Sequence, residues 1–236
     1  MSVVIDRKQL FRDILNSIPE TSTISIIGKM RTGKTTFALN FADYIRRHYN
    51  DMNYSTSLMV FSPEDLENVD LIEKKIISNS RDINIMIFDD LSYIISGYNK
   101  LVRNFLNLIT RIAHVTLSDY NYIFFIGHYS RAISPFLRSS NVVVLTSISH
   151  PEISALKELF TLGSLYDYLE YYSMYPKRYI YLLRYHTYER IIDFTVNRSR
   201  VILRRNLELE KWLMSELEKI ATRWDIQVGA ESYKFH

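Results

Sequence analysis

The chain has 236 residues, 47% hydrophobic and 23% charged, so it can bury a core and is not disordered throughout. Its 29 Lys and Arg against 26 Asp and Glu leave a formal charge of +3, too small a surplus to indicate a nucleic-acid partner by itself. The absence of cysteine excludes disulfides, thiol catalysis and Cys-ligated metals. Charges among the first dozen residues and the lack of a long apolar run lead us to expect a soluble, intracellular protein without a signal peptide or transmembrane segment.

The apolar pattern predicts alternating helices and strands over the first 150 residues. The strands are expected over 23–28, 56–61, 83–90, 121–128 and 141–147, and the helices over 6–17, 34–49, 64–78 and 98–117. The strand over 83–90 is almost entirely apolar, as expected for a parallel strand covered on both faces. Five strands with helices between them are typical of an open parallel sheet with helices on both sides.

The pattern changes after Pro151. Two short helices are expected over 151–160 and 165–174, then a pair of strands over 178–185 and 190–196. An amphipathic helix is expected over 206–223, with one apolar face formed by Leu209, Trp212, Leu213, Leu217 and Ile220. We therefore predict a main domain over 1–197, with its N-terminal helix at 6–17 and its core at 22–195, and a basic helical extension over 198–236 that either packs on the core or docks on a partner.

Residues 28–35, GKMRTGKT, match the Walker A pattern G-x-x-x-x-G-K-[ST] between a predicted strand and a predicted helix. Such a loop turns its backbone N–H groups toward phosphate oxygens at the positive end of a helix. Lys34 would reach the β and γ phosphates, and the Thr35 hydroxyl would bind Mg²⁺. The predicted nucleotide-binding residues are Gly28, Lys29, Met30, Arg31, Thr32, Gly33, Lys34, Thr35 and Thr36.

Two carboxylates, Asp89 and Asp90, follow the apolar strand IMIF, as in a Walker B motif. Nucleotide hydrolysis needs one group to hold the magnesium ion and another to orient or deprotonate the attacking water. We assign Asp89, together with Thr35, to the metal and Asp90 to the water. The alternative interpretation is a solvated strand end that caps the next helix.

The order of the strands refines this interpretation. The strand over 56–61 lies between the phosphate loop and Asp89, and the strand over 121–128 follows and ends at His128. This order is typical of P-loop NTPases in which an additional strand separates the phosphate-loop strand from the Asp strand. His128 is then the candidate γ-phosphate sensor, unless it is an ordinary strand-end histidine. We expect a three-layer α/β P-loop NTPase with a mainly parallel central sheet.

Taken together, GKMRTGKT, IMIFDD, LITRIAH, YIFFIGH with the following Pro135, and NVVVL resemble the FtsK/HerA superfamily of P-loop NTPases. Within it, the chain is similar to the small genome-packaging ATPases of membrane-containing icosahedral viruses, of the archaeal-virus and poxvirus types. The resemblance covers residues 22–195. It departs from the family at Asp90, where Glu is usual, and at His128, where Gln is usual.

This resemblance implies an ATPase that uses Mg²⁺, works as a homo-oligomeric ring such as a hexamer, and moves double-stranded DNA into a capsid. It implies docking to a capsid or membrane protein and a place in the host cytoplasm, with transient presence at the assembling virion. It also implies an arginine that reaches the neighbouring subunit's nucleotide. Arg111 holds the matching position, with Arg131 and Arg138 as alternatives.

Two other interpretations stay open. IMIFDDLS is also similar to the initiator and helicase-loader branch of the AAA+ ATPases, which bind DNA in a nucleotide-dependent way and carry a purely helical lid after the fifth strand. The strand pair over 178–196 argues against that branch. A third interpretation is a non-catalytic P-loop scaffold that binds nucleotide without hydrolysing it.

Overall fold

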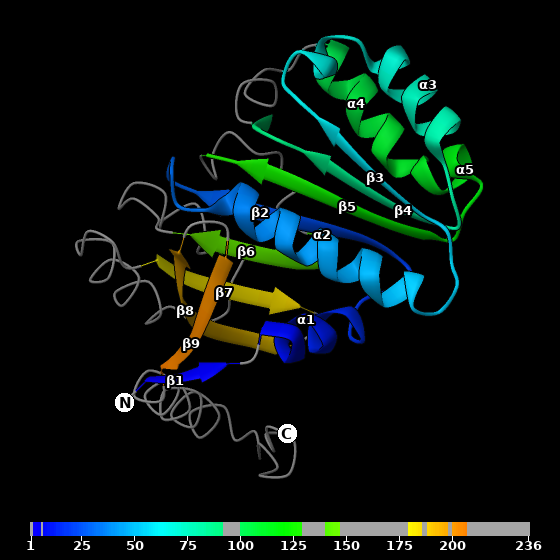
Figure 1. Cartoon of the computed structure of the whole chain (residues 1–236). Coiled ribbons are helices and arrows are strands. Elements are labelled where there is room, and N and C mark those ends of the chain that lie inside the picture. The colour runs from blue at the N-terminus through cyan, green and yellow to red at the C-terminus, as the bar shows by residue number, and fades with distance from the viewer. Residues whose placement is uncertain are drawn as a thin grey trace, which may run out of the picture.

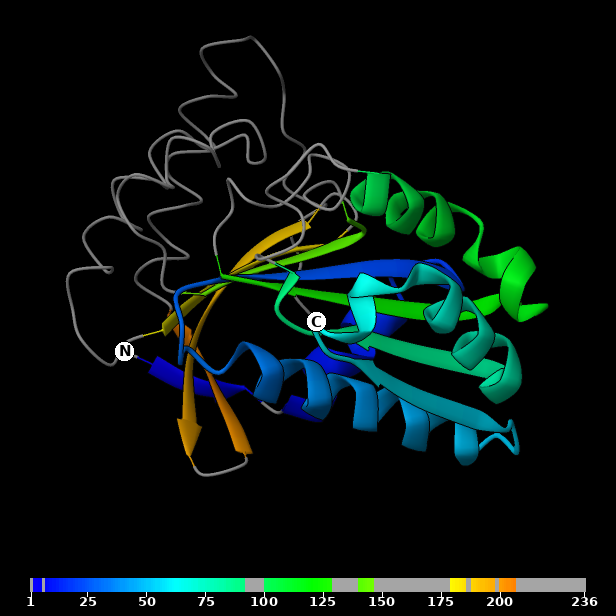
Figure 2. The same ribbon diagram turned by 90° about the horizontal axis from the view of Figure 1, so that it is seen from above.

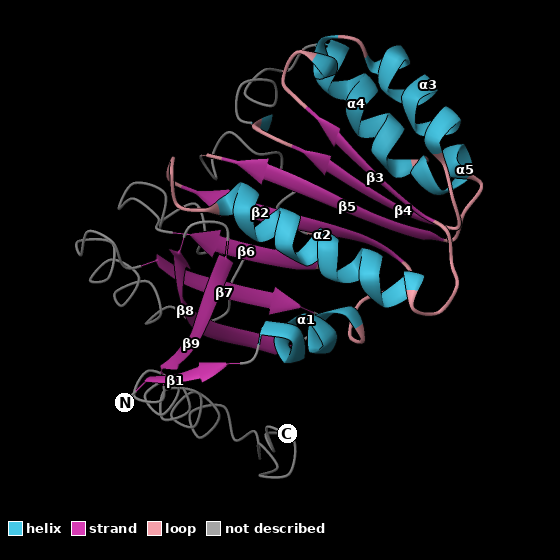
Figure 3. Ribbon diagram, viewed as in Figure 1, coloured by secondary structure: helices cyan, strands magenta, loops and turns pink. Residues whose placement is uncertain are grey.

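The computed structural model describes residues 2–5, 7–91, 100–128, 140–146, 179–185, 188–197 and 200–206. Within these residues, nine strands form one sheet in the order β1-β9-β8-β7-β6-β2-β5-β4-β3 (Figures 1 and 3). One half of the sheet is parallel and the other half is antiparallel. The parallel half carries the phosphate loop.

The parallel half consists of five strands. They are β3 (Thr56–Phe61), β4 (Ile83–Phe88), β5 (Tyr120–Gly127), β2 (Thr21–Gly28) and β6 (Val142–Thr146). All five were predicted from the sequence to within two residues at each end. Strand β5 lies between β2 and β4 and is parallel to both, which confirms the additional-strand arrangement.

The antiparallel half consists of β7 (Tyr179–Tyr185), β8 (Tyr188–Asn197), β9 (Arg200–Asn206) and β1 (Ser2–Ile5). The predicted strand pair corresponds to β7 and β8, and β7 pairs with β6. Strands β1 and β9 were not predicted, and β9 falls in the segment that we assigned to the C-terminal extension. Because β9 pairs with both β8 and β1, residues 200–206 continue the sheet.

Helices cover both faces of the sheet, as Figure 2 shows, so the fold has the three layers that the sequence predicts. Helices α1 (Arg7–Leu15) and α2 (Lys34–Asn50) lie on one face. The other face carries α3 (Val69–Asn79), which follows the short helix η1 (Asp65–Glu67), and then α4 (Lys100–Thr110) and α5 (Ile112–Thr116). The helix predicted over 98–117 is thus divided at Arg111, whose backbone leaves the helical region at φ −107° and ψ 11°.

Aromatic side chains fill the core on both faces of the sheet. On the α2 face, the Phe41 ring stacks on Phe11 of α1 at 4.9 Å between centroids and meets Phe124 of β5 edge-on at 5.8 Å. On the other face, Phe88 of β4 stacks on Phe61 of β3 at 4.7 Å. Since every side chain of β4 is buried, its almost entirely apolar sequence is explained by cover on both sides.

A row of polar side chains crosses the amino ends of three parallel strands. Ser57, Asn84 and Asn121 are paired in register across β3, β4 and β5. The Ser57 hydroxyl donates to Asn84 Oδ1 at 2.9 Å, and Asn84 Nδ2 donates to Asn121 Oδ1 at 3.3 Å. Buried amides of this kind are satisfied in one register only, so the row helps to fix the alignment of the strands.

Several predicted features lie outside the described residues: the helices over 151–160 and 165–174, all of the amphipathic helix over 206–223 except Asn206, which ends β9, and Arg131 and Arg138. In the part of the chain that the structure describes, no helix combines the length and hydrophobicity needed to cross a bilayer.

Candidate nucleotide-binding site

The predicted site residues meet at one edge of the sheet because their strands are parallel and adjacent. In the β2–β5 register Ile27 is opposite Gly127, and in the β4–β5 register Phe88 is opposite Phe125. The carboxyl ends of these strands and the residues that follow them therefore lie side by side. Gly28, Asp89 and His128 are brought together in this way, at the carboxyl edge where open α/β sheets bind ligands.

The loop between β2 and α2 adopts backbone conformations that its sequence favours. Gly33, the residue before α2, has φ 82° and ψ 19°, the left-handed region in which glycine has no Cβ penalty. Arg31 is also left-handed, at φ 60°. The Thr32 hydroxyl donates to the Lys29 carbonyl at 2.8 Å and closes the turn, while Met30 at the tip is 66% exposed. Thr36 lies in the first turn of α2, where its carbonyl accepts a hydrogen bond from Asn40 at 2.7 Å.

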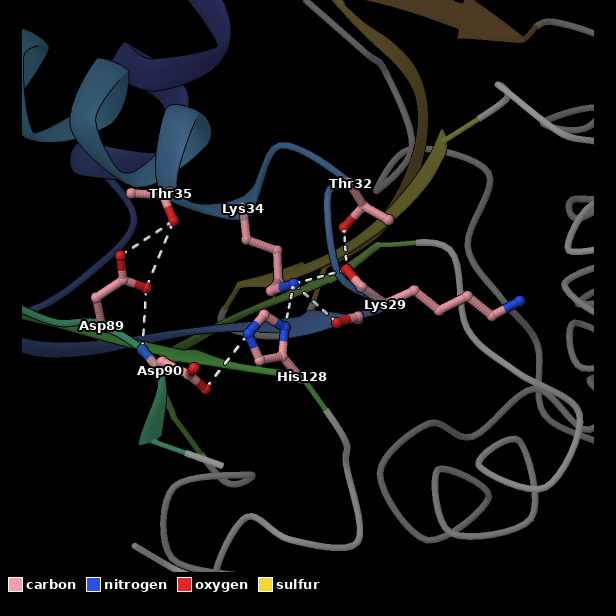
Figure 4. A network of polar contacts seen from close by, with 8 residues as sticks. Lys29, Thr32, Lys34, Thr35, Asp89, Asp90 and His128 are labelled. Atoms are coloured by element: carbon pink, nitrogen blue, oxygen red, sulfur yellow. Dashed lines mark hydrogen bonds and ion pairs between the residues drawn. The ribbon is translucent and has the colours of Figure 1, made fainter. Parts of the chain in front are cut away.

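Lys34 lies under this loop and is only 4% exposed. Its Nζ donates to the carbonyl oxygens of Gly28 at 2.9 Å and Lys29 at 2.7 Å (Figure 4). A third contact, 3.0 Å long, joins Nζ to Nδ1 of His128. Three acceptors around one buried ammonium offset the cost of its desolvation.

The Lys34 contact indicates which tautomer of the neutral His128 ring fits the site. An ammonium group can only donate, so Nδ1 is the acceptor and the proton of the neutral ring lies on Nε2. That Nε2 is 3.3 Å from Oδ1 of Asp90. The imidazole therefore bridges the phosphate-loop lysine and the candidate water-activating carboxylate, as Figure 4 shows. This bridge was not predicted from the sequence.

Asp89 and Thr35 face each other across the site. The Thr35 hydroxyl donates to the Asp89 carboxylate, at 3.2 Å from Oδ2 and 3.4 Å from Oδ1. Asp89 Oδ1 also accepts from the backbone N–H of Asp90 at 2.9 Å. Asp90 itself has φ 52°, a conformation that is uncommon for residues other than glycine and that often occurs at functional sites.

The Thr35 and Asp89 oxygens fit a magnesium ion. A hydroxyl and a carboxylate are hard oxygen ligands, and Mg²⁺ in NTP sites takes one or two protein ligands beside waters and phosphate oxygens. When bound, the ion neutralises developing charge on the phosphates. Thr35 and Asp89, the two residues predicted to bind the metal, therefore lie together in the structure.

Arg111 lies apart from these residues. Its guanidinium forms an ion pair with Glu73 of α3 at 2.6 Å, and the side chain is 54% exposed. None of its described contacts is with the phosphate loop. The structure thus assembles Lys34, Thr35, Asp89, Asp90 and His128 within one chain and leaves Arg111 in the helical layer. Glu73 was not predicted as its partner, because that contact depends on the packing of α3 against the α4–α5 junction.

Comparison with known proteins gives matches in structure alone. No protein-family model matches the chain, and no curated protein matches it in sequence. The sulfate complex of the genome packaging NTPase B204 from Sulfolobus turreted icosahedral virus 2 is 9% identical with a TM-score of 0.50, covering 75% of this chain and 96% of that one. B204, the DNA-packaging ATPase from Sulfolobus turreted icosahedral virus, is 10% identical with a TM-score of 0.50, covering 79% and 98%.

The flagellar accessory protein FlaH from Methanocaldococcus jannaschii is 16% identical, with a TM-score of 0.47 and coverage of 83% and 94%. At these identities the similarity concerns the fold. The chain has the α/β fold of the P-loop NTPases and resembles viral genome-packaging NTPases in its architecture.

Proposed function

We propose that the protein is a magnesium-dependent ATPase that acts as a ring of subunits and moves double-stranded DNA during viral genome packaging. One observation carries the hydrolytic part: Lys34, Thr35, Asp89, Asp90 and His128 converge at the carboxyl ends of β2, β4 and β5. The DNA-translocating part is supported by the architectural similarity to the packaging NTPase B204.

Each side chain has a role in this proposal. The phosphate-loop amides and Lys34 bind the β and γ phosphates, while Thr35 and Asp89 hold the magnesium ion. Asp90 orients the attacking water and accepts its proton. His128 positions Asp90 through Nε2, and its Nδ1 releases Lys34 to the phosphates when nucleotide enters. In this scheme the resting contact of Lys34 with His128 is replaced by its contact with phosphate.

Measurement of phosphate release, with and without duplex DNA, tests the proposal. We expect ATP hydrolysis to fall at least about 100-fold in Lys34→Met and in Asp90→Asn, because each removes a group that acts in the transition state. Lys74→Met, which removes an exposed lysine from α3, is the matched control and should keep the parental rate. Tight nucleotide binding without turnover in the parental protein would instead support a non-catalytic scaffold.

DNA dependence separates a motor from a simple hydrolase. A motor that contacts the phosphate backbone should show a higher ATPase rate with duplex DNA of any sequence, and the stimulation should weaken as salt increases. A Lys34-dependent rate that DNA does not raise, in a protein that remains monomeric, would contradict the translocation proposal while leaving the ATPase proposal intact.

Arg111 is proposed to act on the nucleotide of the neighbouring subunit. Removing a trans-acting arginine lowers phosphoryl transfer by a factor on the order of 10³ to 10⁵, so we expect Arg111→Ala to abolish turnover and leave ATP affinity unchanged. Glu73→Gln removes the partner in the observed ion pair but keeps the guanidinium. If both variants lose activity equally, Arg111 serves the α3 contact alone.

A further inference from the structure

The end of strand β3 lies beside Asp89, one of the two residues that fit the metal ion. Within the described structure β3 is the outermost strand of the parallel half, and β4 is its one neighbour in the sheet (Figure 1). The carbonyl of its last residue, Phe61, accepts from the backbone N–H of Asp89 at 3.0 Å. On the basis of the ATPase function proposed for this site, we propose that Asp65 is a positioning residue for Asp89, which it acts on through the end of β3.

The backbone of Asp89 is held on the β3 side. Its hydrogen bond to Phe61 extends the β3–β4 ladder by one residue beyond Phe88, where β4 ends. The chain then turns at once, because Asp90 has a left-handed backbone at φ 52°. The Asp89 carboxylate, which faces Thr35 in Figure 4, therefore extends from a backbone that is fixed by the end of β3. A shift of that strand end would displace the oxygens that are proposed to bind Mg²⁺.

Asp65 fixes the residue that follows β3. Its Oδ2 accepts from the Ser62 backbone N–H at 2.8 Å and from the Ser62 hydroxyl at 3.1 Å. Hydrogen bonds to an ionised carboxylate are stronger than those between neutral groups. The two bonds close a short turn directly after Phe61. Because an edge strand lacks a second neighbour to hold its end, this turn restrains the Phe61 carbonyl that binds the Asp89 N–H.

The segment that carries Asp65 is itself anchored in the helical layer. Asp65 begins the short helix η1, whose next residue, Leu66, is only 1% exposed. The Leu66 N–H donates to the Pro63 carbonyl at 3.2 Å and continues the turn. Asn68, which follows η1, caps α3 by accepting from the Leu71 N–H at 3.3 Å. The Asp65 carboxylate therefore ties the end of β3 to the buried start of the α3 layer.

Lys75 of α3 adds a second restraint on the same strand end. Its Nζ donates to the Val60 carbonyl at 3.4 Å and lies 4.8 Å from the centre of the Phe61 ring. That ring stacks on Phe88 of β4 at 4.7 Å. The hydrogen bond of Lys75 is long and its side chain is exposed, so its contacts are weaker than those of Asp65. We therefore expect Lys75 to have the same effect on the site as Asp65, but a smaller one.

A Mg²⁺ titration without hydrolysis tests the role of Asp65. A fluorescent, non-hydrolysable ATP analogue is first bound in the absence of metal, and Mg²⁺ is then added until the fluorescence is constant. Removing a group that orients a metal ligand typically weakens metal binding 10- to 100-fold, so we expect about tenfold more Mg²⁺ at half-saturation in Asp65→Ala. The affinity for the metal-free analogue should not change, whereas general damage to the fold would weaken it as well.

The conservative variant distinguishes positioning from a direct effect of charge. Asp65→Asn should keep the parental Mg²⁺ requirement, because its amide oxygen can accept both Ser62 hydrogen bonds. Glu67→Ala, which removes an exposed carboxylate from the same short helix, is the matched control and should also bind Mg²⁺ normally. Lys75→Met should raise the requirement by a smaller factor than Asp65→Ala, and the neighbouring Lys74→Met should not raise it.

Two results would overturn the positioning role. One is an unchanged Mg²⁺ requirement in a folded Asp65→Ala protein. The other is an equal increase in Asp65→Ala and Asp65→Asn, which would mean that the negative charge acts on the ion directly. Both results leave the ATPase proposal intact. A parental protein that does not bind the analogue at all would instead refute the ATPase proposal, and the positioning role with it.

Discussion

Replacement of His128 by alanine tests the coupling between the phosphate-loop lysine and the catalytic carboxylate. In the structure Nδ1 accepts from Lys34 at 3.0 Å, and Nε2 is 3.3 Å from Asp90. Lys34 keeps two carbonyl acceptors in the variant, those of Gly28 and Lys29. The ammonium therefore remains hydrogen-bonded, and the substitution removes a competitor for the phosphates without leaving an unsatisfied charge.

The size of the effect follows from these contacts. A hydrogen bond to a charged group contributes about 1.5–3 kcal/mol, and the two remaining carbonyls place this loss at the lower end. Because nucleotide must displace the His128 contact, His128→Ala should bind ATP up to about tenfold more tightly. Turnover should fall about 100-fold, because Asp90 loses the group that positions it.

Two measurements separate these effects. ATP affinity is measured by calorimetry with a non-hydrolysable analogue, and kcat by phosphate release at saturating ATP. His128→Asn is the matched control, because its amide oxygen can replace Nδ1 as an acceptor for Lys34 but cannot reach Asp90. It should keep the parental affinity and share the loss of kcat. Weaker binding with unchanged kcat in His128→Ala would refute the proposed exchange of the Lys34 contact.

Three further predictions concern stability. Phe41→Ala should lower the free energy of unfolding by about 3–5 kcal/mol in urea titrations, because Phe41 is fully buried against Phe11 and Phe124. The control Leu39→Ala, at an exposed position of α2, should lower it by less than about 1 kcal/mol. Asn84→Ala should cost about 3 kcal/mol by the same assay, since it removes the acceptor of the buried Ser57 hydroxyl and the donor to Asn121 Oδ1. A loss below that of Leu39→Ala would contradict the role of the polar row. Burial raises the pKa of Tyr122, whose hydroxyl lies 2.5 Å from that of Tyr49. The unfolded chain therefore loses this proton first, and stability should fall as the pH rises above about 10, with a smaller fall in Tyr122→Phe.

The parallel half of the fold was predictable because its signals are local. Each buried strand is a short apolar run, and the phosphate loop identifies β2 and α2 through a contiguous motif. An additional strand between the phosphate-loop strand and the Asp strand was predicted from the order of motifs along the chain. It is confirmed by the register, in which β5 pairs with both strands.

The antiparallel edge was only partly predictable, because β1 and β9 depend on distant partners. Strand β1 has four residues and pairs with β9, so that Ser2 lies opposite Asn206. Nothing within either segment identifies the other. The sequence of β9, RVILRRN, mixes apolar and basic residues, and we interpreted it as the approach to a helix. Its strand conformation follows from pairing on both sides with β8 and β1.

The candidate site was predictable as a set of residues but not as a network. Lys34, Thr35, Asp89 and Asp90 were identified by motif, and their functional roles remain predictions. The position of His128 between Lys34 and Asp90 depends on the alignment of three strand ends, which no local pattern encodes. The ion pair of Arg111 with Glu73 likewise depends on helix packing across the sheet face.

The pairing of β1 with β9 has a consequence for how the chain acquires its fold during synthesis. Helix α1 and the parallel strands can associate once residue 146 has emerged, but β1 must wait for residues 200–206. Until residues 179–185 have emerged, the outer edge of β6 lacks its sheet partner β7. Contacts of such long sequence separation form slowly, and open strand edges favour aggregation. We therefore expect the nascent chain to depend on chaperones most strongly after the parallel core forms and before β7–β9 and β1 complete the sheet.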